Sequence, residues 1–84
     1  MPLEYLTLAD LSLAQTALIQ HLHIDGEIRR RLLDLGFSPG CDVTPLFRSP
    51  LGDPTAYQVF DSVIALRQED AGQIQVTLCS TEVF

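Results

Sequence analysis

Lysine and tryptophan are both absent from this chain of 84 residues, and only two cysteines are present, Cys41 and Cys79. Five arginines face eleven acidic residues, which gives a formal net charge of −6. Affinity for nucleic acid comes largely from basic side chains that neutralise phosphates, and attraction to anionic lipid headgroups also requires them. The composition therefore argues against nucleic acid and against an anionic membrane surface as partners.

Long hydrophobic runs are missing as well. The uninterrupted apolar stretches are only a few residues long, whereas a membrane-spanning helix needs about 20. The segment MPLEYLTLAD carries Glu4 and Asp10 where a secretory signal would be basic. The two cysteines form no CxxC pair, and we expect both to be reduced and buried as small apolar side chains. These features favour a cytoplasmic protein that does not itself enter the membrane.

Patterns that would indicate an enzyme are not found. The sequence has no nucleophile beside a base in a recognisable context, no phosphate-binding glycine loop and no HExxH pattern. A chain of this length is expected to form one domain, residues 1–84. We therefore expect a single small domain without catalytic activity and without a required cofactor.

One basic segment stands out against this acidic background: RRRLLDLGFSPG, residues 29–40. The pattern predicts a helix over about residues 26–35. Ile28, Leu32 and Leu35 recur at i, i+4 and i+7, and we expect this apolar arc to face the core. The three consecutive arginines then lie on the other sides of the helix.

The end of this segment is punctuated by glycines and a proline. Gly36 suits the left-handed position that ends a helix, and Phe37 would follow it in a Schellman motif and pack on Leu32. Pro39 and Gly40 suit the two central positions of a type II turn. The chain is therefore expected to leave the helix, turn sharply and enter a strand.

The remainder is predicted to be mainly β. Alternating or continuous apolar patterns predict five short strands, at residues 16–22, 42–48, 56–60, 63–67 and 74–78. In the first strand, Ala17 and Ile19 are assigned to one face and Leu18 and Leu22 to the other. Closing these strands into a small barrel would remove their exposed edges.

Two further local patterns refine this prediction. Thr7 and Asp10 have the spacing of a capping box at the start of a helical turn. In the second strand, Val43, Pro45 and Phe47 are assigned to one side. Because proline cannot donate to a β-ladder, Pro45 predicts either an edge strand or a bend.

Four stretches together resemble one known family. RRRLLDLGFSPG, SPLGDP (49–54), IALR (64–67) and DAGQIQV (70–76) occur in the order and at the spacing of the FeoA family of ferrous-iron transport proteins. The resemblance runs from about Leu6 to Val76. It implies an SH3-like five-stranded barrel with one α-helix inserted after the first strand. It also implies a small cytosolic partner of FeoB, the membrane Fe(II) transporter that carries a cytosolic GTP-binding domain.

The resemblance thus implies an accessory protein of ferrous iron uptake, recruited to the inner face of the membrane by docking on the cytosolic region of a FeoB-type transporter and modulating it. We assign the contact surface to Arg29, Arg30 and Leu33 on the helix and to Leu51 in the SPLGDP loop, because an arginine beside an exposed leucine is typical of interface centres. The alternative is a solvated helix face with pairs such as Arg30 and Asp34, each worth only about 0.3–0.5 kcal/mol.

A second hypothesis is that the chain itself binds Fe(II) or another divalent metal. In a strand, His21, His23 and Asp25 would project to one face, and imidazole and carboxylate groups suit such ions. A third interpretation is a homo-oligomer assembled through an open strand edge at Pro45. The sequence leaves these alternatives open.

Overall fold

The computed structural model describes residues 6–78. These residues form a five-stranded antiparallel sheet, one α-helix of ten residues and two short helical turns. In chain order, the elements are η1 (Leu8–Asp10), β1 (Ala17–Leu22), α1 (Gly26–Leu35), β2 (Asp42–Arg48), β3 (Thr55–Val59), β4 (Ser62–Leu66), α2 (Gln68–Ala71) and β5 (Ile74–Leu78). The predicted mainly β architecture, with a helix inserted after the first strand, is confirmed.

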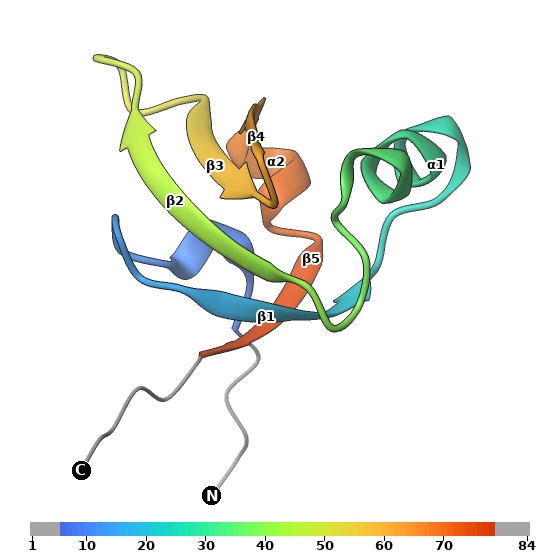
Figure 1. Cartoon of the computed structure of the whole chain (residues 1–84). Coiled ribbons are helices and arrows are strands. Elements are labelled where there is room, and N and C mark those ends of the chain that lie inside the picture. The colour runs from blue at the N-terminus through green and yellow to red at the C-terminus, as the bar shows by residue number, and fades with distance from the viewer. Residues whose placement is uncertain (1–5, 79–84) are drawn as a thin grey trace, which may run out of the picture.

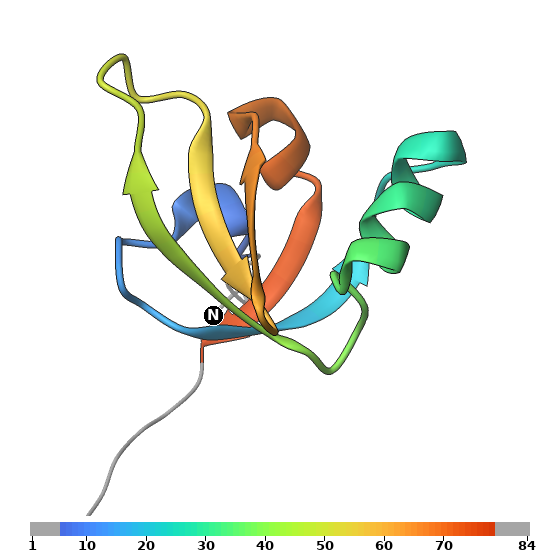
Figure 2. The same ribbon diagram turned by 45° about the horizontal axis from the view of Figure 1, so that its top comes forward.

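The strands follow the order β4-β3-β2-β1-β5, and each neighbouring pair is antiparallel. Figure 1 shows the sheet curling around its concave side, with α1 standing beside it. Turning the molecule shows the same arrangement from above (Figure 2). The predicted closure is not formed by strand pairing, because β4 and β5 remain the two ends of the sheet in the part of the chain described.

The core fills the concave side of this sheet. Ala17, Ile19, Val43, Ile74 and Val76, from β1, β2 and β5, are almost completely buried there. Because side chains alternate between the faces of a strand, every second residue faces the core except where a bulge interrupts the pattern. The core therefore holds the sheet in its curled shape.

The short turns η1 and α2 pack against each other over the open part of the curled sheet. The predicted capping box starts η1, where the backbone N–H of Thr7 donates to Oδ2 of Asp10 at 3.0 Å. Leu8 and Leu11, which flank this turn, are buried. The capping box therefore anchors the N-terminal part of the described chain to the core.

Two β-bulges change which residues face inward. Between β1 and β5 the register shifts at Gln20, and between β2 and β3 it shifts at Leu46. An extra residue reverses the facing of everything after it. Leu22 is therefore in the core, not on the opposite face from Ile19, and Phe47 points to solvent. Both sequence assignments were wrong for this reason.

Pro45 is buried and lies in β2, which is the central strand of the sheet. Its predicted place on an edge strand is wrong, and the alternative, a bend, is confirmed by the adjacent bulge at Leu46. Its missing N–H costs nothing there, because β1 pairs with β2 only at Val43 and Asp42. The carbonyl of Pro45 accepts a hydrogen bond from the N–H of Ala14 at 2.7 Å.

Helix α1 ends as the sequence predicts. Gly36 has φ 112°, and its N–H donates to the carbonyl of Leu33 at 3.1 Å. The N–H of Phe37 donates to the carbonyl of Leu32 at 2.9 Å, which completes the Schellman pattern. Leu32 and Phe37 then enter the core together. The Pro39–Gly40 turn follows directly, with the N–H of Cys41 donating to the carbonyl of Ser38 at 3.0 Å.

The predicted core face of α1 is only partly correct. Leu32 is buried, but Ile28 remains 50% exposed and Leu35 39% exposed. The helix stands to one side of the sheet, as both views show (Figures 1 and 2), so the sheet covers only one position of the apolar arc. No helix in the described part of the chain is both long enough and apolar enough to cross a bilayer.

Candidate interaction surfaces

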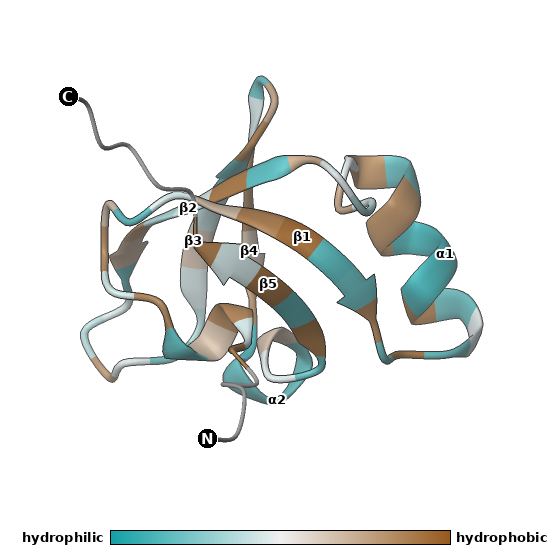
Figure 3. Ribbon diagram, turned by 90° about the horizontal axis from the view of Figure 1, so that it is seen from below, coloured by the Kyte–Doolittle hydropathy of each residue, from teal (hydrophilic) through white to brown (hydrophobic). Residues whose placement is uncertain are grey.

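The outer face of α1 carries the arginines predicted to contact a partner. Arg29 and Arg30 are exposed there, and Leu33 is half-buried against the core. A shallow depression is lined by Gly26, Glu27, Arg29, Arg30 and Leu33. In Figure 3, α1 shows hydrophilic stretches alternating with hydrophobic ones. The structure therefore brings Arg29, Arg30 and Leu33 together on one accessible surface, which we call the α1 outer face.

The loop between β2 and β3 holds Leu51 away from the protein, with 94% of its surface exposed. Hydrogen bonds within the loop fix its shape: the N–H of Gly52 donates to the carbonyl of Ser49 at 2.8 Å, and Oγ of Ser49 donates to the carbonyl of Asp53 at 2.7 Å. The loop rises at the end of β2, far from α1 in both views (Figures 1 and 2). Leu51 and the α1 outer face are thus separate surfaces.

A side chain also connects this loop to α2. The carboxylate Oδ1 of Asp53 accepts a hydrogen bond from the backbone N–H of Gln68 at 2.8 Å. Gln68 is the first residue of α2, so Asp53 satisfies one of the amides that the start of a helix leaves unpaired.

The candidate metal ligands His21, His23 and Asp25 are only partly brought together. His21 lies in β1 and His23 follows it, and their ring centroids are 4.3 Å apart. Nε2 of His23 is 3.0 Å from Oε1 of Gln75. Asp25 lies beyond the end of the strand, at the N-cap position of α1. Among residues 6–78, no group of three His, Cys, Asp or Glu side chains is arranged to hold a metal ion.

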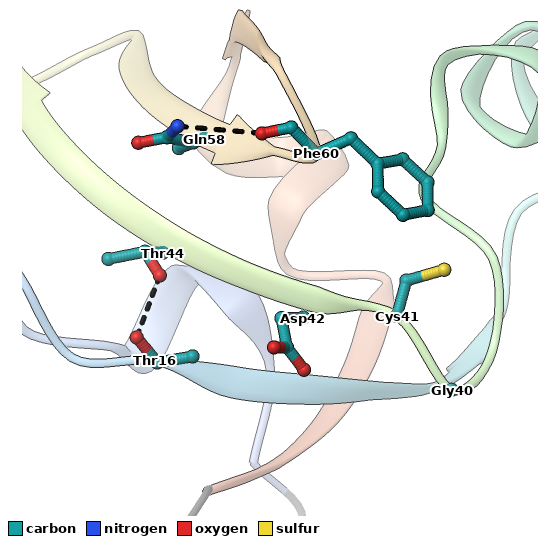
Figure 4. Close-up of a pocket in the computed structure, with 7 residues that line it drawn as sticks. All are labelled: Thr16, Gly40, Cys41, Asp42, Thr44, Gln58 and Phe60. Atoms are coloured by element: carbon teal, nitrogen blue, oxygen red, sulfur yellow. Dashed lines mark hydrogen bonds between the residues drawn. The ribbon is translucent and has the colours of Figure 1, made fainter.

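A further depression lies on the outer side of β2, near the turn after α1 (Figure 4). Phe60 borders it, 69% exposed and with φ 56°, a conformation that aromatic residues rarely adopt. Cys41 is half-buried there, with Sγ 3.3 Å from Oγ of Ser38, so it is less buried than expected. Cys79 lies outside the described residues. The sequence analysis gave no indication of this exposed ring.

Comparison with known proteins identifies the family. The FeoA domain family matches residues 6–78. A fusion protein from Porphyromonas gingivalis, named Fe(2+) transport protein A/Fe(2+) transporter FeoB, is 36% identical over 74 residues. That alignment covers 88% of this chain but only 9% of the fusion protein.

Solved structures agree with the fold. The FeoA protein from Chlorobium tepidum superposes with a TM-score of 0.86 at 27% identity, over 93% of this chain and 74% of that one. Stenotrophomonas maltophilia FeoA, solved with zinc and described as an SH3 domain protein, gives a TM-score of 0.71 at 36% identity, over 84% and 88% of the two chains. The expected SH3-like fold is therefore confirmed, and the chain belongs to the FeoA family, which is associated with ferrous iron transport.

Proposed function

We propose that this chain is an accessory protein of ferrous iron uptake that docks on the cytosolic region of a FeoB-type transporter and modulates it. The observation that carries the proposal is the Porphyromonas gingivalis fusion protein, in which the two partners share one polypeptide. Linking two domains gives them a high effective concentration, up to about millimolar for short linkers. Where the two domains are not linked, the same association requires an interface between them.

The α1 outer face has the composition of such an interface. Arg29 and Arg30 flank Leu33, and arginine with neighbouring apolar surface is enriched at the centres of interfaces. Glu27 and Asp34 offset part of the charge of the three arginines, but α1 keeps a small positive excess in a chain whose net charge is −6. This excess would orient the helix toward an acidic surface on the partner. Leu51, at the other end of the molecule, would serve as a second contact only for a partner that reaches around the sheet.

Docking changes transport only if the affinity differs between two states of the transporter. Each 1.4 kcal/mol of difference in binding free energy shifts that equilibrium by about tenfold. A small rigid domain can supply this difference by contacting two parts of the transporter that move relative to each other. The separation of Leu51 from the α1 outer face is compatible with such a bridging role.

A titration of the purified cytosolic domain of a FeoB-type transporter, followed by calorimetry, tests this proposal. We expect Arg30→Glu/Leu33→Asp to weaken binding by at least about tenfold, since both the charge and the apolar contact are lost. Arg48→Glu is the matched control, because it reverses one arginine away from α1. Equal binding by the double variant, with circular dichroism showing that it is folded, would remove the α1 outer face from the interface. Absence of binding by the wild type would contradict docking itself.

A second proposed function is the binding of Fe(II) or another divalent metal. The adjacent rings of His21 and His23 favour it, and the Stenotrophomonas maltophilia relative was solved with zinc. An anaerobic Fe(II) titration tests it. Stoichiometric binding that His21→Ala/His23→Ala abolishes would support this function, and equal weak binding by both proteins would contradict it.

A further inference from the structure

A cleft separates the inner side of α1 from β4. Its helical wall is formed by Ile28, Arg31, Leu32 and Leu35. The facing wall consists of residues 64–67, with Asp70 of α2 at the margin. The volume of this cleft is about 350 Å³, compared with about 480 Å³ for the depression near Phe60. We call this feature the α1–β4 cleft. Apolar side chains predominate on both walls, each wall also carries one arginine, and half of the surface of Ile28 remains open to the cleft or to solvent.

The α1–β4 cleft is distinct from the α1 outer face. Successive residues of an α-helix are rotated by about 100°. On this basis Ile28, Leu32 and Leu35 cluster on one side, and Arg29, Arg30 and Leu33 lie nearly opposite. A partner in the cleft would therefore not compete for the outer face, and substitutions on the two sides can be compared as a matched pair.

The strand that forms one wall of the cleft has an unused edge. β4 pairs with β3 from Ser62 to Leu66 and is the last strand of the sheet. Within residues 6–78, no other strand pairs with its outer side. An edge strand presents a row of backbone N–H and C=O groups to which another extended chain can bind.

The charges around the cleft differ in sign from the rest of the molecule. Two of the five arginines, Arg31 and Arg67, line it, together with a single carboxylate, that of Asp70. A chain with net charge −6 is repelled by a second copy of itself. The local excess of positive charge instead complements an acidic segment of another protein.

We propose that the α1–β4 cleft binds an extended segment of a partner protein, which adds as a strand to the outer edge of β4. Alternate apolar side chains of this segment pack against Ile28 and Leu35, and its acidic side chains lie near Arg31 and Arg67. Backbone pairing supplies affinity in this mode of recognition, and the apolar wall and the arginines supply specificity. The inference depends on the cleft alone and stands whether or not the α1 outer face binds a transporter.

A selection from displayed random peptides of about 10 residues, roughly the upper length of a typical strand, tests the proposal without a known partner. Peptides are first selected for binding to the wild-type protein. Those that also bind the Ile28→Asp/Leu35→Asp variant are then discarded, because they bind outside the cleft. We expect enrichment of sequences in which apolar residues alternate and Asp or Glu flank them. The proposal would be overturned if no sequence were enriched or if basic peptides were enriched. Enriched peptides with apolar residues at helical spacing would also overturn it.

An enriched peptide, made synthetically, then tests the binding mode. We expect amide protons at alternate positions of β4 to exchange at least about tenfold more slowly when the peptide is bound, since hydrogen-bonded amides exchange only on opening. Arg31→Glu/Arg67→Glu should weaken binding by about tenfold or more, and a peptide with lysine in place of its acidic residues should restore it.

The matched control for these variants is Arg29→Glu/Arg30→Glu, which reverses two exposed arginines on the opposite side of α1. It should bind the peptide within about twofold of the wild type, because exposed charges away from a contact contribute little. Strand addition to β4 would be overturned by slower amide exchange confined to α1, or by an equal loss of peptide binding in this control. It would also be overturned if light scattering showed that the peptide-free protein is a dimer that blocks the cleft.

Discussion

The side chain of Phe60 lies directly against the backbone of Gly36. A Cβ atom built on Gly36 would be 2.8 Å from Cδ2 of Phe60 and 2.8 Å from Cγ1 of Val59. Gly36 ends α1, and Phe60 is in the turn between β3 and β4. This close approach therefore joins the end of the helix to the hairpin whose second strand forms the α1–β4 cleft.

Gly36→Ala is expected to lower the free energy of unfolding by about 2–4 kcal/mol, since it combines a positive φ with crowding of a buried side chain. Gly40→Ala is the matched control: Gly40 has φ 93°, but no atom lies within 4 Å of the added Cβ. That variant should lose only the conformational part, about 1–2 kcal/mol. Urea unfolding measures both, and equal losses would show that the contact with Phe60 and Val59 carries no energy.

Leu32 should hold α1 against the sheet almost alone. Leu32→Ala removes a buried side chain and is expected to cost about 2–5 kcal/mol. Ile28→Ala, at a position 50% exposed, should cost about 1 kcal/mol or less, because only part of the side chain leaves an apolar environment. Urea unfolding of the two variants distinguishes them. Similar losses would show that the whole apolar arc is packed in solution.

Local signals in the sequence predict the elements of this fold well. Gly36, Pro39 and Gly40 fix the end of α1 and the turn that follows, because few residue types adopt the required φ values. The predicted bounds of the helix, 26–35, and of the second strand, 42–48, match the structure. These features depend on neighbours in the sequence, so the sequence alone is sufficient to predict them.

Features that depend on distant neighbours could not be predicted in the same way. The bulges at Gln20 and Leu46 arise from the register with β5 and β3. No local residue marks the first, and Pro45 indicated a bend at the second without showing which later residues would change face. The two bulges reversed the expected positions of Leu22 and Phe47. Similarly, a period of 3.6 residues identifies the apolar side of α1 but not how much of it the sheet covers.

The candidate contact residues illustrate the same limit. Exposure of Arg29, Arg30 and Leu51 could be predicted, because charge and loop composition favour the surface. Their arrangement could not, because the distance between α1 and the β2–β3 loop depends on how the sheet curls. The α1–β4 cleft was missed for this reason, since its walls are more than 25 residues apart in the sequence.

Asp53 should stabilise the protein by capping α2 from a loop 15 residues earlier in the chain. Asp53→Ala leaves the N–H of Gln68 without this acceptor and is expected to cost about 0.5–2 kcal/mol. Asp53→Asn is the control, because its side-chain oxygen can still accept, and it should retain most of the stability. Thermal unfolding of the three proteins measures the difference. Identical losses in both variants would point to the charge of Asp53, not to the hydrogen bond.

Ionisation of the Tyr57 side chain is expected to lower the stability of the folded protein at high pH. This side chain is buried beneath η1, where its hydroxyl donates to the carbonyl of Leu8 at 3.4 Å. Burial raises the pKa of Tyr57 above its ordinary value of 10.0, against smaller opposing effects of Thr55 and Arg48. Above pH 10 the unfolded chain therefore releases this proton before the folded protein does, and the free energy of unfolding falls as pH rises toward the folded pKa.

Tyr57→Phe should remove this part of the pH dependence. We expect the variant to lose about 1 kcal/mol at pH 8 through the missing hydrogen bond, and then to lose less stability than the wild type as the pH rises from about 9 to about 11. Urea unfolding monitored by circular dichroism at each pH gives both slopes. Because Tyr5 is present in both proteins, its titration affects them equally. Parallel slopes would show that ionisation of Tyr57 does not oppose folding.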